Sequence, residues 1–106
     1  YGSSKAAVAH LARIAAAEHA AQGIRINAVA PGRVDTPIWT KNAYFTEMVE
    51  RLGSRDAALA CLAQESTPLG RFASAEEMAG QIGFLLSAAA WNVTGTVLVS
   101  DGGYSL

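Results

Sequence analysis

The sequence contains little cysteine, no excess of charge of either sign and no long hydrophobic run. Its one cysteine, Cys61, cannot form a disulfide within the chain, and it stands in an apolar helical pattern where a small buried side chain is expected. Disulfides are typical of oxidising compartments. We therefore expect a reducing environment and a cytoplasmic protein.

The few charged residues exclude two classes of partner. The chain has 8 basic and 9 acidic residues spread along its length, with a formal net charge of −1. Because nucleic acids and membrane surfaces are bound through clustered positive charge, neither is expected as a partner. The most apolar window, residues 79–91, is too short to cross a bilayer, and we expect no secretory leader. His10 and His19 have no cysteine at ligand spacing, so no metal site is expected.

Apolar residues make up 51% of the 106 positions, which is ample for the core of one domain at most. Residues 3 to about 22 predict a helix, because Leu11 and Ile14 recur at helical spacing among many alanines. Gly23 follows where a C-terminal cap belongs. The small side chains of this helix suit close packing against another helix or a sheet.

Two short apolar runs predict β-strands, at residues 24–30 and 96–100. Neither run alternates as a half-exposed antiparallel strand does, and helical patterns separate them, so parallel strands in an α/β fold are favoured. Two strands form only a marginal sheet. We therefore expect the chain to be half of a domain.

Three further helices are expected between the strands, each opened by a residue whose hydroxyl can cap a helix. The expected caps are Thr36, which precedes Pro37, then Ser54 and Ser74. Gly53 ends the first of these helices and Pro68 follows the second. Ser74 and Glu77 form a capping box. The third helix carries an apolar face of Met78, Ile82, Leu85, Leu86 and Ala89.

Tyr1 and Lys5 form a candidate acid/base pair. Residues four apart share one helical face, so the phenol and the ammonium can reach the same small volume. A free phenol has a pKa of about 10, so a tyrosine that exchanges protons near neutral pH needs positive charge beside it. Lys5 is placed to supply that charge. The alternative is an ordinary solvated helix face, because this spacing also arises by chance.

Four motifs follow one another along the chain. They are Tyr1-Gly2-Ser3-Ser4-Lys5-Ala6-Ala7-Val8, Ile24-Arg25-Ile26-Asn27-Ala28-Val29-Ala30-Pro31-Gly32, Thr67-Pro68-Leu69-Gly70-Arg71-Phe72 and Asp101-Gly102-Gly103. Through them the chain resembles the C-terminal half of the classical short-chain dehydrogenase/reductase family. The resemblance implies an α/β fold, in which residues 1–106 are the C-terminal part of a doubly wound parallel-sheet Rossmann domain, with two strands and about four helices. It also implies hydride transfer between NAD or NADP and an alcohol or carbonyl substrate.

The resemblance assigns roles to the first motif and to the loop that follows the first strand. Tyr1 corresponds to the general acid/base, and Lys5 to the group that assists it and binds the nicotinamide ribose, so both contact the cofactor. In the loop, Pro31, Gly32, Val34 and Thr36 correspond to residues beside the nicotinamide, where the Val34 backbone bonds the carboxamide. A plain turn at Pro31-Gly32 and a plain N-cap at Thr36 are the alternative interpretations.

Residues 37 to about 66 correspond to the family's variable substrate lid. The resemblance implies that Ile38 and Trp39 contact substrate, with Trp39 favoured modestly over simple packing within the lid. Tyr44, Phe45 and Met48 line an apolar pocket if their stripe faces the nicotinamide. The charged side chains of this region are expected to form a solvated face.

The family's glycine-rich phosphate loop, its cofactor selector and its active-site Asn and Ser would all precede Tyr1. We therefore expect the N-terminal half of the domain to exist elsewhere and this chain alone to be inactive. A homo-oligomer, a dimer or tetramer, is also expected. Two alternatives stay open: a non-catalytic fragment that retains oligomerisation surfaces, and an epimerase or dehydratase using the same tyrosine and cofactor.

Overall fold

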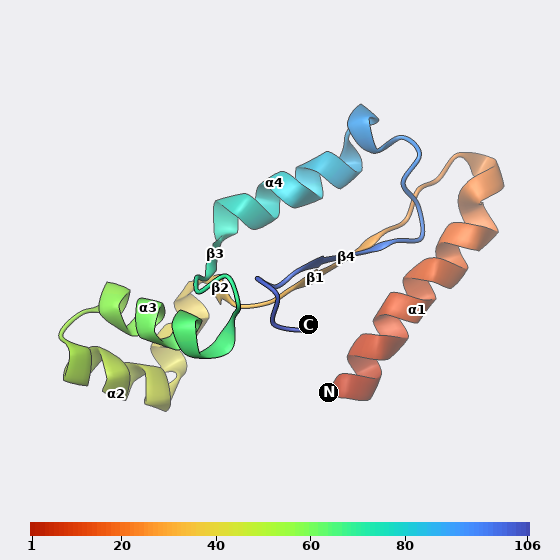
Figure 1. Cartoon of the computed structure of the whole chain (residues 1–106). Helices are drawn as coiled ribbons and strands as arrows, with labels where there is room; N and C mark the ends of the chain where they lie inside the picture. The colour runs from red at the N-terminus through yellow and green to blue at the C-terminus, as the bar shows by residue number, and fades with distance from the viewer. The chain divides into compact units, whose positions relative to one another are not determined.

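The computed structural model describes all residues, 1–106, and divides them into two compact units. The first unit contains residues 1–30 and 80–99, and the second contains residues 31–79 and 100–106. The chain therefore changes unit at the end of its first strand, within its last α-helix and at the end of its last strand (Figure 1). No helix is long and apolar enough to span a membrane.

The first unit begins with α1 (Gly2–His19), which a short 3₁₀ segment, η1 (Ala20–Gln22), extends. Gly23 ends it in the left-handed conformation, with φ of 74°, as the sequence predicts. Ala16 is the buried residue of α1, and it packs beside Gly95. The small alanine side chains of α1 thus allow the backbone at Gly95 to approach the helix closely, as the alanine-rich composition predicts.

Two strands, β1 (Ala28–Pro31) and β4 (Val97–Ser100), pair side by side (Figure 1). The Ala28 N–H donates to the Thr96 carbonyl at 2.9 Å and the Gly32 N–H donates to the Ser100 carbonyl at 3.0 Å. From the first of these bonds to the second, the residue number rises by four on both strands. The two strands are therefore parallel. The predicted α/β class with parallel strands is confirmed.

The first strand is shorter than predicted, because residues 24–27 form no regular ladder. Side-chain hydrogen bonds and isolated backbone bonds hold them, such as that from the Gly95 N–H to the Ile26 carbonyl at 2.8 Å. The Ile26 N–H donates to the Thr94 hydroxyl at 3.1 Å, and the Asn27 amide bonds the Val93 carbonyl and the Thr96 N–H, at 3.0 and 3.1 Å. Apolar composition in this run therefore reflects partial burial, and the ladder begins only at Ala28.

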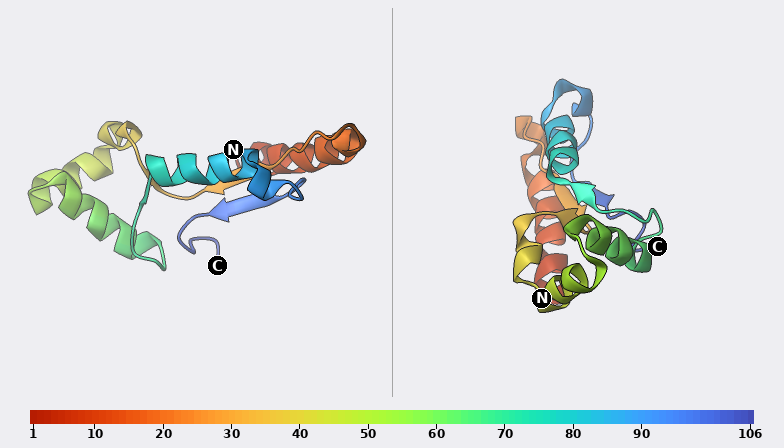
Figure 2. Two further views of the ribbon diagram at one scale, coloured as in Figure 1. Left: turned by 90° about the horizontal axis from the view of Figure 1, so that it is seen from above. Right: turned by 90° about the vertical axis from the view of Figure 1, so that its left-hand side faces the viewer.

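The second unit is mainly helical: η2 (Pro37–Lys41), α2 (Ala43–Leu52) and α3 (Arg55–Ser66) follow one another, and α2 and α3 lie side by side (Figure 2). The sequence predicts one helix from Pro37 to Gly53, which is wrong. Asn42 interrupts it with extended backbone, and its side-chain oxygen accepts from the Phe45 N–H at 3.0 Å as the N-cap of α2. Gly53, with φ of 87°, and Ser54, which accepts from the Ala57 N–H, act as predicted.

The core of the second unit lies between α2 and α3. Its buried members are Phe45, Met48, Ala58 and Leu62, and Trp39, Val49, Leu59, Cys61 and Phe72 pack against them. Cys61 is half-buried at the edge of this core. Phe45 and Met48, which the sequence allows as pocket-lining residues, are 2% and 1% exposed. They therefore hold the two helices together.

Two very short strands, β2 (Val34–Asp35) and β3 (Ala73–Ser74), pair in parallel within the second unit. The sequence does not predict them, because two-residue strands carry no periodicity. β3 leads into α4 (Ala75–Leu86), whose capping box forms as predicted. α4 ends at Leu86, so Ala89 lies in the 3₁₀ segment η3 (Ala88–Ala90) and outside the predicted helix. The four predicted helices correspond to α1–α4.

Candidate active site

Tyr1 and Lys5 meet at the first turn of α1. The Tyr1 carbonyl accepts hydrogen bonds from the Lys5 N–H at 3.1 Å and from the Ser4 hydroxyl at 2.8 Å. The same turn brings the Lys5 ammonium to 5.4 Å from the centre of the Tyr1 ring. Tyr1 is 96% exposed, so its hydroxyl is accessible. The ammonium therefore lies over the ring of an exposed tyrosine, where a cation and an aromatic face attract each other.

The loop predicted to lie beside the nicotinamide belongs to the second unit. Pro31 ends β1, and the Gly32 N–H continues the pairing with β4. Val34 lies in β2, where the carbonyl of the preceding residue, Arg33, accepts from the Ala73 N–H at 3.0 Å. The loop is therefore fixed by backbone pairing on both sides of Gly32.

Thr36 follows β2 and occupies the N-cap position of η2 with extended backbone, at φ −138° and ψ 164°. Its hydroxyl makes no capping bond, contrary to the prediction. A 3₁₀ turn closes on the Thr36 carbonyl instead, which accepts from the Trp39 N–H at 3.3 Å. The Thr36 side chain is thus not occupied by a helix cap.

Ile38 and Trp39, the predicted substrate contacts, differ in their surroundings. Ile38 is 70% exposed. Trp39 is half-buried, with its ring centre 5.2 Å from that of Phe72 and 6.0 Å from that of Phe45. Its indole N–H donates to the Val34 carbonyl at 2.8 Å. The structure therefore packs Trp39 against the core of the second unit and bonds it directly to the loop.

Arg55, at the start of α3, reaches the same loop, whereas the sequence predicts a solvated face for the charged side chains of this region. Its guanidinium bonds the Asp35 carboxylate at 2.6 Å and lies 5.9 Å from the centre of the Phe45 ring. The hydrogen bond to Asp35 raises the pKa of Arg55 above its ordinary value. An Asp and an Arg twenty residues apart have no periodic signature, so the sequence offers no signal for this pair.

Comparison with known proteins decides the family. The family model described as enoyl-(acyl carrier protein) reductase matches residues 1–105. The rat protein named dehydrogenase/reductase SDR family member 6 is 44% identical over the whole chain, which covers 40% of its length. The chain belongs to the short-chain dehydrogenase/reductase family.

Other members of the short-chain dehydrogenase/reductase family give the same relationship. Cis-4-hydroxycyclohexanecarboxylate dehydrogenase from Sinomonas cyclohexanicum is 42% identical over 99% of the chain and 37% of the relative. The crystal structure of L-sorbose reductase from Gluconobacter frateurii, complexed with NADPH and L-sorbose, superposes with a TM-score of 0.81 at 35% identity, over 94% of this chain and 38% of that one. The chain thus spans about two fifths of the length of the relatives it matches.

Two further family motifs meet in the second unit. The Leu69 N–H donates to the Gly102 carbonyl at 3.0 Å, which joins the turn after α3 to the Asp101 turn. Hydrogen bonds from Ser105 and Gly103 to the Asp101 carboxylate close the chain after β4 and lower the pKa of that carboxyl. The Asp101 carboxylate therefore stabilises the turn that follows β4.

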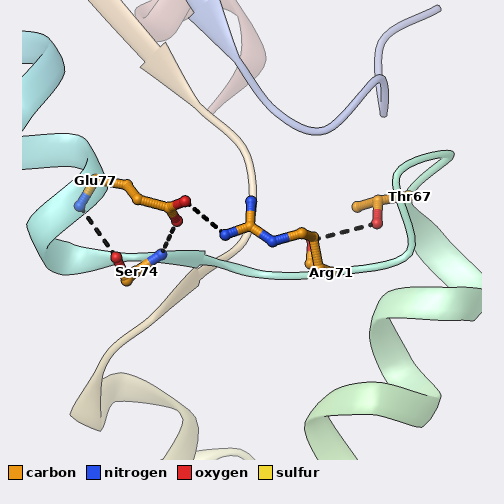
Figure 3. Close-up of polar contacts among 4 residues, drawn as sticks. All are labelled: Thr67, Arg71, Ser74 and Glu77. Atoms are coloured by element: carbon orange, nitrogen blue, oxygen red, sulfur yellow. Dashed lines mark hydrogen bonds and ion pairs between the residues drawn. The ribbon is translucent and has the colours of Figure 1, made fainter.

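The turn after α3 is also tied to the start of α4 (Figure 3). The Thr67 hydroxyl donates to the Ala63 carbonyl at 2.9 Å and more weakly, at 3.4 Å, to the carbonyl of Arg71. The Arg71 guanidinium bonds Glu77 at 2.5 Å, and Glu77 also accepts from the Ser74 N–H at 2.7 Å. The bonds from Ser74 and Arg71 lower the pKa of Glu77. This network therefore fixes the segment that connects α3 to α4.

Proposed function

We propose that the protein containing this chain is an oxidoreductase that transfers a hydride between NAD or NADP and an alcohol or carbonyl substrate. The observation that carries the proposal is the Lys5 ammonium, 5.4 Å from the centre of an exposed Tyr1 ring, in a chain of this family. The nicotinamide supplies or accepts the hydride. The structure of L-sorbose reductase in complex with NADPH supports this choice of cofactor.

Tyr1 acts as the general acid/base in this proposal. In reduction its phenol gives a proton to the carbonyl oxygen, and in oxidation its phenolate removes the proton from the alcohol. Lys5 stabilises the phenolate by its charge. Its ammonium has three donors, so it can bind the ribose hydroxyls as well.

Pro31, Gly32, Val34 and Thr36 hold the nicotinamide in this proposal. Pro31 and Gly32 line the nicotinamide with their backbone, the Val34 backbone bonds the carboxamide, and the Thr36 hydroxyl bonds the carboxamide or a phosphate. The donor set fits such a ligand, because the Thr36 hydroxyl makes no bond to the helix it precedes. A loop fixed by strand pairing is also well ordered before a ligand binds.

Ile38 and Trp39 are the proposed substrate contacts, on a lid formed by residues 37–66. Ile38 is 70% exposed, which supports its role as a substrate contact. Trp39 is half-buried, so part of its side chain stays exposed for such a contact. The named substrates of the two relatives, a cyclic hydroxy acid and a sugar, carry the hydroxyl or carbonyl group that this chemistry requires. A small or medium alcohol or carbonyl compound is therefore proposed.

Residues 1–106 are proposed to be the C-terminal part of a complete Rossmann domain, inactive without the rest. The share of the relatives that the chain covers supports this, as do the exposed apolar residues of α1, Val8 at 59% and Leu11 at 64%. We further propose a cytoplasmic homodimer or homotetramer, supported by the same apolar surface and by the single cysteine. Light scattering on the complete protein measures its assembly.

Nicotinamide fluorescence tests the proposed function. NADH and NADPH are titrated into the complete protein and into the isolated 106-residue chain, and turnover is measured with secondary alcohols and ketones. We expect binding and turnover with the complete protein and neither with the isolated chain. A complete protein that binds neither cofactor would favour the non-catalytic alternative. Cofactor binding with epimerisation or dehydration, and no net oxidation, would favour the third interpretation.

A further inference from the structure

Two side chains of the lid hold β2, the two-residue strand just before Thr36. Arg55 bonds the Asp35 carboxylate at 2.6 Å, and the Trp39 indole N–H donates to the Val34 carbonyl at 2.8 Å. One bond comes from the start of α3 and the other from η2. The consecutive residues Val34 and Asp35 are therefore each fixed by a different element of the lid.

Both of these side chains are also anchored on the core of α2 and α3. Phe45, which is 2% exposed, contacts each of them: the Arg55 guanidinium lies 5.9 Å from its ring centre and the Trp39 ring lies 6.0 Å from it. Arg33 covers Trp39 at 5.5 Å from its ring centre. Because one buried ring supports both contacts, displacement of α2 or α3 displaces the groups that hold β2.

The Asp35–Arg55 pair is suited to positioning more than to overall stability. The two side chains are 39% and 40% exposed, and ion pairs at such positions contribute little to folding. Their removal should therefore leave the folded unit intact. Removal of the pair should instead increase the conformational freedom of β2, which directly precedes Thr36.

We propose that Arg55 is a positioning residue for residues 34–36, and that Arg55 and Trp39 couple the position of the lid to the nicotinamide-contacting loop. The consequence for the cofactor rests on the proposed function. A loop held in its binding geometry loses less conformational freedom when a ligand binds, so the restraint strengthens binding. In return, a bound nicotinamide favours the lid position in which both contacts are made.

The test compares Arg55→Gln with Arg51→Gln in the complete protein. Arg51 is exposed at the end of α2 and makes no ion pair, so its variant removes the same charge from the same helical pair. In hydrogen–deuterium exchange without cofactor, we expect the amides of residues 34–36 to exchange about three- to tenfold faster in Arg55→Gln than in the wild type. This factor corresponds to the stabilisation that one exposed ion pair and one cation–ring contact provide. Amides of α1 should be unaffected, and Arg51→Gln should match the wild type.

Further variants and cofactor titrations complete the test. Arg55→Lys should recover part of the protection of amides 34–36. In the double variant Asp35→Asn/Arg55→Gln these amides should exchange no faster than in either single variant, because the two residues act as one pair. Binding of NADH or NADPH should weaken several-fold in Arg55→Gln and keep its wild-type strength in Arg51→Gln. Unchanged exchange at 34–36, or faster exchange with unchanged cofactor affinity, would overturn the positioning role. A wild type that binds no cofactor would instead overturn the proposed function, and exchange would still decide whether Arg55 restrains the loop.

Discussion

The Cα atom of Asp101 lies 2.6 Å from the point where a side-chain carbon on residue 32 would stand, and Gly32 leaves that point empty. The Asp101 Cβ and carbonyl oxygen are 2.7 and 3.0 Å from the same point. Carbon atoms in contact are about 3.5–4 Å apart. Glycine is therefore required at position 32 by the packing of two motifs far apart in the sequence.

Gly32→Ala should destabilise the protein, because the added methyl group forces the loop and the Asp101 turn apart. A loss of about 1–3 kcal/mol in the free energy of unfolding is expected, as for other overpacked sites. Gly80→Ala is the matched control: nothing lies within 4 Å of its added carbon in α4, and alanine favours a helix by up to about 1 kcal/mol. Urea unfolding of the complete protein measures both. Equal stability of Gly32→Ala and wild type would contradict the prediction.

Tyr1→Phe should abolish most turnover and leave cofactor affinity nearly unchanged. The substitution removes only the hydroxyl that exchanges the proton, and loss of a general acid/base lowers rates by about 10²–10⁴-fold. Tyr104→Phe, at a 63% exposed position after β4, is the control and should keep normal turnover. Steady-state kinetics and nicotinamide fluorescence on the complete protein separate the two effects. Unchanged turnover in Tyr1→Phe would remove Tyr1 from its proposed role.

The capping box at the start of α4 should make stability depend on pH. Bonds from Ser74 and Arg71 lower the pKa of Glu77, so its contribution is present above the pKa of the unfolded carboxyl and is lost as pH falls through the lower folded value. Glu77→Gln should therefore be less stable than wild type at pH 7, and the difference should shrink below about pH 4. Thermal unfolding between pH 7 and 3 measures this. Glu76→Gln, at the exposed neighbouring position, serves as control, and a pH-independent difference for Glu77→Gln would refute the linkage.

Local signals in the sequence predict the ends of helices well. Gly23 and Gly53 adopt positive φ, and Ser54 and Ser74 cap the helices they precede, because each interaction spans only a few residues. The sequence does not predict the Asn42 cap, because Thr36-Pro37 offers a stronger start signal. The residues between them form a 3₁₀ turn, whose short length leaves no helical periodicity.

Contacts between distant residues set the limits of sequence interpretation. The Tyr1–Lys5 contact follows from helical spacing, so the sequence is sufficient to find it. The Arg55–Asp35 pair and the Trp39–Val34 bond depend on how η2 and α3 pack, which no spacing rule encodes. The same limit applies to residues 24–27, where side-chain bonds replace the expected ladder.

Asn27 should be essential for the entry to β1, because one side-chain amide satisfies two backbone groups. It donates to the Val93 carbonyl at 3.0 Å and accepts from the Thr96 N–H at 3.1 Å. Asn27→Ala leaves the Thr96 N–H unpaired and removes one of two donors from the Val93 carbonyl, which also accepts from Arg25 at 3.2 Å. A loss of about 1–3 kcal/mol in the free energy of unfolding is expected. Asn27→Asp keeps the acceptor but sets a carboxylate oxygen against a carbonyl, and it should not recover stability at pH 7. Asn92→Ala, at an exposed position, should lie within about 0.5 kcal/mol of wild type. Urea unfolding of the complete protein measures all three, and a stable Asn27→Asp would show that only the bond to Thr96 matters.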